Sequence, residues 1–205
     1  LLCVLNQILA GRQRLVLFAY WLSPVVALAT FGLGLNDVIP AVYLMIGILF
    51  LKLQRLRLTG IFFALAISAK LSMLIVFPFV ILYLYNNKPL RQLLYDFGIG
   101  FIAASALLGL PFLLSSSGMI MLFKNPEMSD ILSLSFEVSQ GAVIYILPIL
   151  FAGILYFIWR ARRLNFDLFM AIGGIVFLVV VILMPAASGW FVWTIPFLVF
   201  YQAMS

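Results

Sequence analysis

Two ionisable residues, Asp37 and Lys70, stand inside long apolar stretches and are the side chains of this sequence best suited to do chemistry. Asp37 follows the apolar run 15–35, and Lys70 is the one charged residue between Leu58 and Tyr85. A charge within a membrane span costs about 2.5–3.5 kcal/mol on insertion scales, so it needs a partner, a cavity or a function. An ammonium in a partly dehydrated cavity binds phosphate strongly, and a carboxylate can deprotonate a hydroxyl.

Three interpretations of these two charges are open. Lys70 can extend its ammonium to the lipid headgroups while Asp37 merely ends a helix. The two residues can form a structural ion pair, or Lys70 can bind the phosphate of a ligand. We favour the phosphate, because a charge that only satisfied another charge could have been omitted together with it.

The composition places these residues in a membrane protein. Hydrophobic residues make up 66% of the 205 positions and charged residues 9%, against about 45–50% and about 25% in soluble domains. We therefore predict an all-α, polytopic transmembrane bundle of about eight membrane-crossing helices, each able to cross a hydrocarbon core of about 30 Å. A truncated helix, 1–10, precedes them, and the predicted crossings are 15–35, 38–51, the two arms of 58–85, 93–114, 143–159, 167–184 and 190–201.

The chain is expected to form one transmembrane domain, 1–205, that is an internal fragment of a longer protein. It opens on Leu1 without a Met and stops at Ser205, close behind an apolar run. It holds a single cysteine, Cys3, and no histidine, which excludes an internal disulfide framework, a cysteine zinc site and a histidine base. The net charge of +6 arises between the spans, so it indicates topology rather than nucleic-acid binding.

The stretch 58–85 can be one tilted span or a hairpin of two short helices with Lys70 near its tip. A hairpin places every Lys and Arg except Lys70 and Lys124 on one side of the membrane. A single span would place half of these residues on each side. The positive-inside rule therefore favours the hairpin and makes the basic side cytoplasmic. Arms of about 12–14 residues reach only about 20 Å, so the tip should lie below the outer surface, where irregular backbone must line a polar cavity.

The candidate site on this topology gathers on the non-cytoplasmic side. Asn36, Asp37, Lys70 and the turn 185–190, with Ser188 and Trp190, converge there. Trp190 and Trp193 suit an aromatic belt at the membrane interface, which we favour over sugar stacking. Elsewhere, Gly100 with Ala104 and Ser105 with Gly109 are pairs of small residues four apart, typical of helix packing surfaces.

The segment 115–140 is predicted to be a non-cytoplasmic loop with an interfacial helix. Asn125 suits an N-cap, Pro126 the first helical position and Glu127 the first turn. Capping alone accounts for Glu127 better than contact with a ligand does.

The order of these segments resembles that of the GT-C glycosyltransferases. "SPVVALATFGLGLND" precedes a span and a basic turn, then comes "LTGIFFALAISAKLSMLIVFPF", and much later "SGWFVWTIPFLVFY". In mannosyltransferase-like members, an Asn-Pro or similar pair precedes a Gly-x-x-Asp turn, and a Lys follows at the head of a Pro-containing apolar helix. Ser23-Pro24, the turn 34–37, and Lys70 with Pro78 occupy those places here.

The resemblance implies an integral membrane enzyme that transfers a sugar from a polyprenyl-phosphate carrier to a lipid, glycan or protein acceptor on the non-cytoplasmic face. It implies donor-binding roles for Asn36, Asp37, Lys70, Ser188 and Trp190, and a catalytic carboxylate in a loop upstream of Leu1. A divalent metal, Mg²⁺ or Mn²⁺, could orient the leaving phosphate. The membrane would be the bacterial plasma membrane, or that of the endoplasmic reticulum in a eukaryote.

Two other classes remain open. A transporter or lipid flippase would also place polar groups below one membrane surface, although no second hairpin matching 58–85 is visible, as an inverted repeat would require. A non-catalytic membrane subunit of a larger assembly is the third class.

Overall fold

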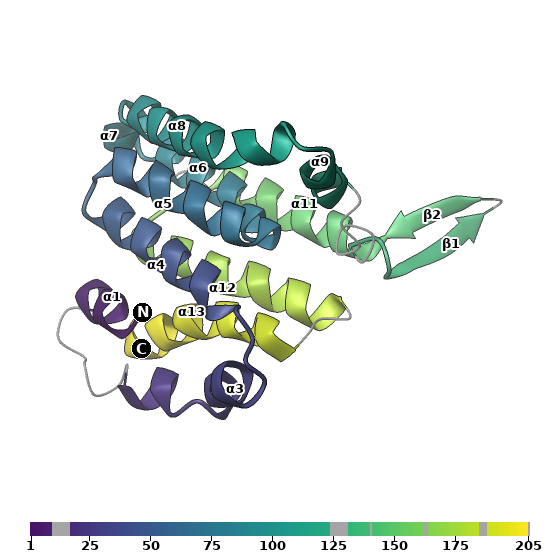
Figure 1. The fold of residues 1–205 in the computed structure, drawn as a ribbon, viewed down its shortest axis with the longest axis horizontal. Coiled ribbons are helices and arrows are strands. Elements are labelled where there is room, and N and C mark those ends of the chain that lie inside the picture. Colours follow the sequence, from purple (N-terminus) through teal and green to yellow (C-terminus); the bar gives the residue numbers. More distant parts are fainter. Residues whose placement is uncertain (10–16, 124–130, 140, 162–163, 185–187, 205) are drawn as a thin grey trace.

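A computed structural model describes residues 1–9, 17–123, 131–139, 141–161, 164–184 and 188–204, and these residues fold mainly as helices (Figure 1). The N-terminal part comprises α1 (Leu2–Ile8), the π-helical turns η1 (Leu17–Trp21) and η2 (Leu28–Gly32), and the short α3 (Pro24–Ala27) between those turns. The central helices are α4 (Val38–Lys52), α5 (Leu56–Ala69), the 3-10 helix η3 (Leu71–Val76), α6 (Phe77–Asn86), α7 (Lys88–Arg91), α8 (Leu94–Leu113) and α9 (Ser116–Phe123). The remaining elements are β1 (Ser135–Ser139), β2 (Ala142–Tyr145), α11 (Ile146–Arg160), α12 (Phe166–Leu183), the 3-10 turn η4 (Ser188–Trp190) and α13 (Phe191–Met204).

The stretch 58–85 reverses direction, as the hairpin prediction requires. The guanidinium nitrogen Nη2 of Arg57, at the start of α5, lies 2.9 Å from Oδ1 of Asp96, in the first turn of α8. The chain between them leaves along α5, breaks at Lys70 and returns along η3 and α6, so both ends of the hairpin meet at one end of the bundle. We call this the Arg57 end and the opposite one the Lys70 end.

The Arg57 end collects basic residues, as the topology argument predicts. Asn86, at the end of α6, donates hydrogen bonds to the carbonyls of Ile158 and Ala161. The neighbouring Asn87 donates to the carbonyl of Leu164 at 2.8 Å. These contacts bring the turn after α6 beside the turn after α11. The basic residues of the elements that meet there are Lys52, Arg55, Arg57, Lys88, Arg91 and Arg160.

Helices α5 and α8 cross with their backbones in contact. A Cβ atom at Gly60 would overlap the carbonyl of Phe97 and lie 2.6 Å from the backbone nitrogen of Phe101, and one at Gly100 would overlap the carbonyl of Arg57. Small residues permit such close crossings in membrane helices. The prediction of a packing surface is therefore confirmed at Gly100, whereas nothing lies within 4 Å of a Cβ at Gly109.

Two of the described helices, Leu94–Leu113 and Phe166–Leu183, are long and apolar enough to cross a membrane. Five shorter apolar helices accompany them, spanning Val38–Lys52, Leu56–Ala69, Leu71–Asn86, Ile146–Arg160 and Phe191–Ala203. A mainly helical fold is therefore confirmed, and the count of about eight crossings is not.

Two predicted spans differ from the structure. The run 15–35 is not one helix, because Ser23 is extended before Pro24 and the chain continues as separate π and α turns. The span expected at 143–159 begins only at Ile146, because Ala142–Tyr145 pairs with Ser135–Ser139 in an antiparallel hairpin. Gly141 turns this hairpin with a φ of +91°, a conformation open to glycine. The fold is thus mainly helical with one small two-stranded hairpin, which projects from the helices (Figure 1).

The interfacial helix predicted within 115–140 falls partly outside the described residues. Its proposed cap, Asn125 with Pro126 and Glu127, lies outside the described residues. The described parts of this segment are 115–123, which contains α9, and 131–139, which contains β1. Every residue of β1 is exposed.

Candidate donor-binding site

Lys70 lies where the helical backbone is interrupted at the Lys70 end. It follows the last residue of α5 with φ −155° and ψ 120°, an extended conformation, and its own carbonyl accepts a hydrogen bond from the Met73 amide at 3.0 Å. The chain then tightens into η3 before α6 begins. The irregular backbone predicted at the tip of the hairpin is therefore present.

Asp37 approaches from the turn that precedes α4. Gly34 adopts a φ of +63° in this turn, and Asp37 occupies the N-cap position of the helix. An N-cap carboxylate usually accepts a hydrogen bond from the amide at position N2 or N3, but N3 here is Pro40, which has no N–H. Because Asp37 makes no cap hydrogen bond, its carboxylate is left to turn toward another donor.

Lys70 and Asp37 form an ion pair. Lys70 Nζ donates to Asp37 Oδ1 at 2.8 Å, and 22% of the lysine side chain and 8% of the aspartate side chain are exposed. Both charges are therefore largely removed from solvent, and each stabilises the other. The ion-pair interpretation of the sequence is the one that the structure displays.

Two tryptophans complete the surroundings of the lysine ammonium. Lys70 Nζ lies 5.3 Å from the ring centroid of Trp190 and 4.8 Å from that of Trp193. The two indole rings are stacked, with centroids 5.1 Å apart. Both distances to the ammonium lie within the range of cation–π attraction. Only 5% of Trp190 and 1% of Trp193 is exposed, so their interpretation as an interfacial belt is wrong.

Gly189 is part of the site and was not singled out from the sequence. A Cβ atom there would overlap Asp37 Oδ2 and lie 2.8 Å from Leu35 Cδ1. The carboxylate therefore rests directly on the backbone of η4, and only glycine leaves room for it. The sequence offered one signal, the position of this glycine between two candidate residues, Ser188 and Trp190.

Helix α12 holds Trp193 in place. The ring of Phe177 lies 6.0 Å from Trp193 and 5.6 Å from Phe197, and a Cβ at Gly173 would come within 2.6 Å of the Phe197 ring. These contacts fix α13 against α12. The indole Nε1 of Trp193 is buried and has no hydrogen-bond partner among the residues that the structure describes.

The other predicted site residues lie at the edge of this group. Asn36 is exposed beside Asp37, and its backbone carbonyl accepts from the Ile39 amide at 3.0 Å. Ser188 begins η4, next to Gly189, and its side chain lies outside what the structure describes. Asp37, Lys70 and Trp190 are thus brought together, and Trp193 and Gly189 join them.

The site does not provide a cage for a divalent metal. No group of three His, Cys, Asp or Glu residues comes together in the described part of the chain. Asp37 is already paired with Lys70. The described residues alone therefore do not form a protein cage for Mg²⁺ or Mn²⁺.

The fold and this site define a helical membrane protein with a cationic, aromatic-lined site at one end. A family model described as ALG3 protein matches residues 14–184, and the chain belongs to this family. The family comprises dolichyl-phosphate-mannose-dependent mannosyltransferases of the endoplasmic reticulum membrane. Membership in it indicates a membrane glycosyltransferase that uses a lipid-linked sugar donor.

The family assignment agrees with the GT-C resemblance and favours it over a transporter or a non-catalytic subunit. The family is one of the endoplasmic reticulum membrane, and the bacterial plasma membrane is not supported. No curated protein and no solved structure matches the chain.

Proposed function

We propose that Lys70 binds the phosphate of a dolichyl-phosphate sugar at the non-cytoplasmic end of a GT-C-type bundle. The single observation that carries this proposal is the ammonium of Lys70, held at a break in the helical backbone by Asp37 and two tryptophans. The sugar would pass to a lipid, glycan or protein acceptor in the lumen. About eight membrane crossings, some of them short, would place the Lys70 end on that side.

The chemistry of the transfer explains why a cation is needed. The bond between the sugar C1 and the phosphate oxygen breaks, and a bond between C1 and the acceptor oxygen forms. Dolichyl phosphate leaves with the bonding electron pair, and the acceptor proton passes to a base. Lys70 would stabilise the negative charge that grows on the leaving phosphate.

Asp37 is proposed as a positioning residue for Lys70. An ammonium has three N–H donors, so Lys70 can hold Asp37 Oδ1 and a phosphate oxygen together. Because Asp37 is engaged by Lys70, we assign removal of the acceptor proton to another carboxylate, as the family resemblance implies. Asn36 and Ser188 border the site and are proposed to contact the donor.

The two tryptophans give the site its second property. Trp190 and Trp193 exclude water around the ammonium, which strengthens its attraction for phosphate.

The proposal is tested by the binding of dolichyl phosphate to the full-length enzyme in detergent, measured by isothermal calorimetry. Lys70→Met should weaken binding by about 10- to 150-fold, since a hydrogen bond to a charged group is worth about 1.5–3 kcal/mol. Lys88→Met is the matched control, because Lys88 is exposed at the Arg57 end. Equal affinities of Lys70→Met and wild type would exclude the phosphate role.

A further inference from the structure

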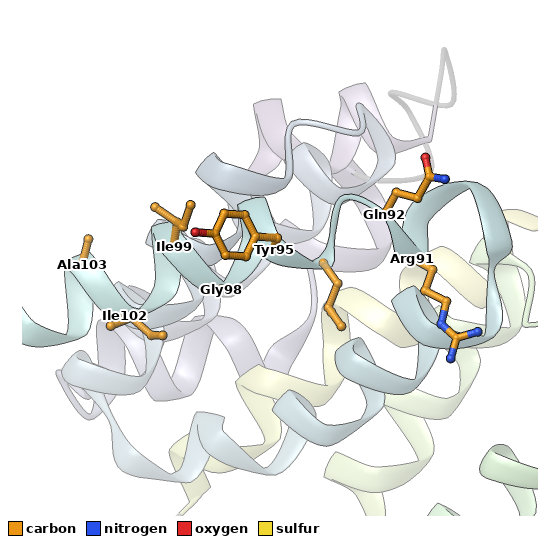
Figure 2. A pocket seen from close by; sticks show the side chains of 8 residues that line it. Arg91, Gln92, Tyr95, Gly98, Ile99, Ile102 and Ala103 are labelled. Atoms are coloured by element: carbon orange, nitrogen blue, oxygen red, sulfur yellow. The ribbon is translucent and has the colours of Figure 1, made fainter.

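A hollow on the outer side of α8 lies far from the Lys70 site. Its volume is about 790 Å³, and residues that line it include Arg91, Gln92, Tyr95, Gly98, Ile99 and Ile102. Figure 2 shows Arg91 and Gln92 at one end and the apolar side chains following along the helix. The hollow, which we call the α8 groove, starts at the Arg57 end. Lys70 follows the last residue of α5, so it lies at the opposite end of a helix that is about 20 Å long.

The apolar part of the α8 groove belongs to a helix that can span a membrane but is hardly covered by protein. Only 11% of the apolar stretch within Leu94–Leu113 is buried by the rest of the protein. Tyr95 and Ile102 are exposed to 77% and 68%, although both line the groove. In a bilayer such a face meets acyl chains. Gly98 leaves an opening between Tyr95 and Ile102, because nothing lies within 4 Å of a Cβ atom placed at Gly98.

The other end of the α8 groove is cationic. The guanidinium of Arg91 lies 3.8 Å from the centroid of the Tyr85 ring. Stacking uses the face of a guanidinium and leaves the N–H groups at its edge directed outward, the arrangement that binds phosphate. Lys88 is exposed in the same short helix, and the nearby Asp96 is neutralised by Arg57 at 2.9 Å.

We infer that the α8 groove binds one anionic phospholipid, with the headgroup phosphate on Arg91 and an acyl chain across Gly98. Charge and apolar surface follow each other along the groove in the same order as in such a lipid. Basic pockets beside membrane helices on the cytoplasmic side bind acidic headgroups. This site goes beyond the proposed transfer reaction, because it shares no residue with the Lys70 site.

The test measures the melting temperature of the full-length protein in detergent micelles with added dioleoyl phosphatidylinositol or dioleoyl phosphatidylcholine. Lipid at about 100 times its dissociation constant should raise the melting temperature by roughly 5 °C or more, and only with the anionic lipid. Arg91→Gln and Gly98→Leu should each abolish the shift. Native mass spectrometry should show one bound phosphatidylinositol lost in the same two variants.

Two matched control variants lie outside the groove. Arg160→Gln removes a basic residue at the Arg57 end outside the groove, and Gly109→Leu adds a side chain at another open position of α8. Both should keep the shift. The inference would be overturned by an equal shift with phosphatidylcholine or by a full shift in Arg91→Gln. It would also be overturned if neither lipid produced a shift, because another part of the protein would then cover the groove.

Discussion

Lys70 Nζ and Asp37 Oδ1 are 2.8 Å apart although the two residues are separated by 33 positions in the sequence. The contact joins the turn before α4 to the break after α5. Gly189 presses a third segment, η4, against the same carboxylate. The proposed donor site therefore depends on three turns that meet at one end of the bundle.

The first prediction separates stability from donor use at this ion pair. Lys70→Ala leaves the Asp37 carboxylate buried without its partner, which should cost about 3–5 kcal/mol of unfolding free energy. Asp37→Asn in the same chain should restore part of this loss, because the amide needs no counter-charge. Thermal denaturation of the full-length single and double variants measures the effect.

Donor affinity, measured on the same proteins, completes the experiment. Lys70→Ala and the double variant should both bind dolichyl phosphate weakly, because neither retains the ammonium. If the double variant regained stability and all variants kept wild-type donor affinity, Lys70 would be purely structural.

The second prediction concerns the close approach of η4 to Asp37. Gly189→Ala should displace the carboxylate and weaken donor binding, since the added methyl group overlaps Asp37 Oδ2. Gly153→Ala, in α11, is the control and should have no effect on binding, because nothing lies within 4 Å of a Cβ there. Wild-type affinity in Gly189→Ala would show that Asp37 is not needed in its present position.

The third prediction concerns the indole rings around Lys70. Trp193→Leu removes a ring 4.8 Å from the ammonium and should weaken donor binding by roughly 2- to 30-fold, since a cation–π contact is worth about 0.5–2 kcal/mol. Trp193→Phe should recover part of the affinity. Trp159→Leu is the control, because Trp159 is 58% exposed near the end of α11. Equal losses in Trp193→Leu and Trp159→Leu would argue against a specific role of the site.

The fourth prediction tests the crossing of α5 and α8. Gly100→Ala should lower the melting temperature by several degrees, because a Cβ at this position overlaps the Arg57 carbonyl and must push the helices apart. Gly109→Ala, on the same helix, should leave it unchanged or slightly raised, since alanine favours helix more than glycine does. Equal melting temperatures for the two variants would contradict this packing.

The fifth prediction fixes the two sides of the membrane. With Cys3 replaced by serine, a cysteine at Lys88 should react with an impermeant maleimide only from the cytoplasm, and one at Ser117 only from the lumen. Lys88 is preferable to its neighbour Asn87, whose side chain donates hydrogen bonds to the carbonyls of Tyr83 and Leu164. Labelling of position 88 from the lumen would invert the proposed topology.

The sequence by itself determined the class of this protein and much of its secondary structure. Long apolar runs and the distribution of basic residues are local properties, so they predicted a helical membrane protein and a reversal of the chain at Lys70. They also drew attention to Asp37 and Lys70, because a charge is costly in an apolar segment wherever the chain folds. The order of the motifs led to the GT-C glycosyltransferases, and the family model agrees.

Only the tertiary structure decided which residues meet. The burial of Trp193 depends on α12 lying beside α13, and the need for glycine at position 189 depends on the turn before α4 reaching η4. The hairpin of β1 and β2 and the broken run 15–35 were missed because mean hydropathy does not distinguish an apolar strand or a π turn from a membrane helix. Lys70 could have paired with either a ligand or Asp37, and the packing of three distant turns brought the carboxylate within 2.8 Å.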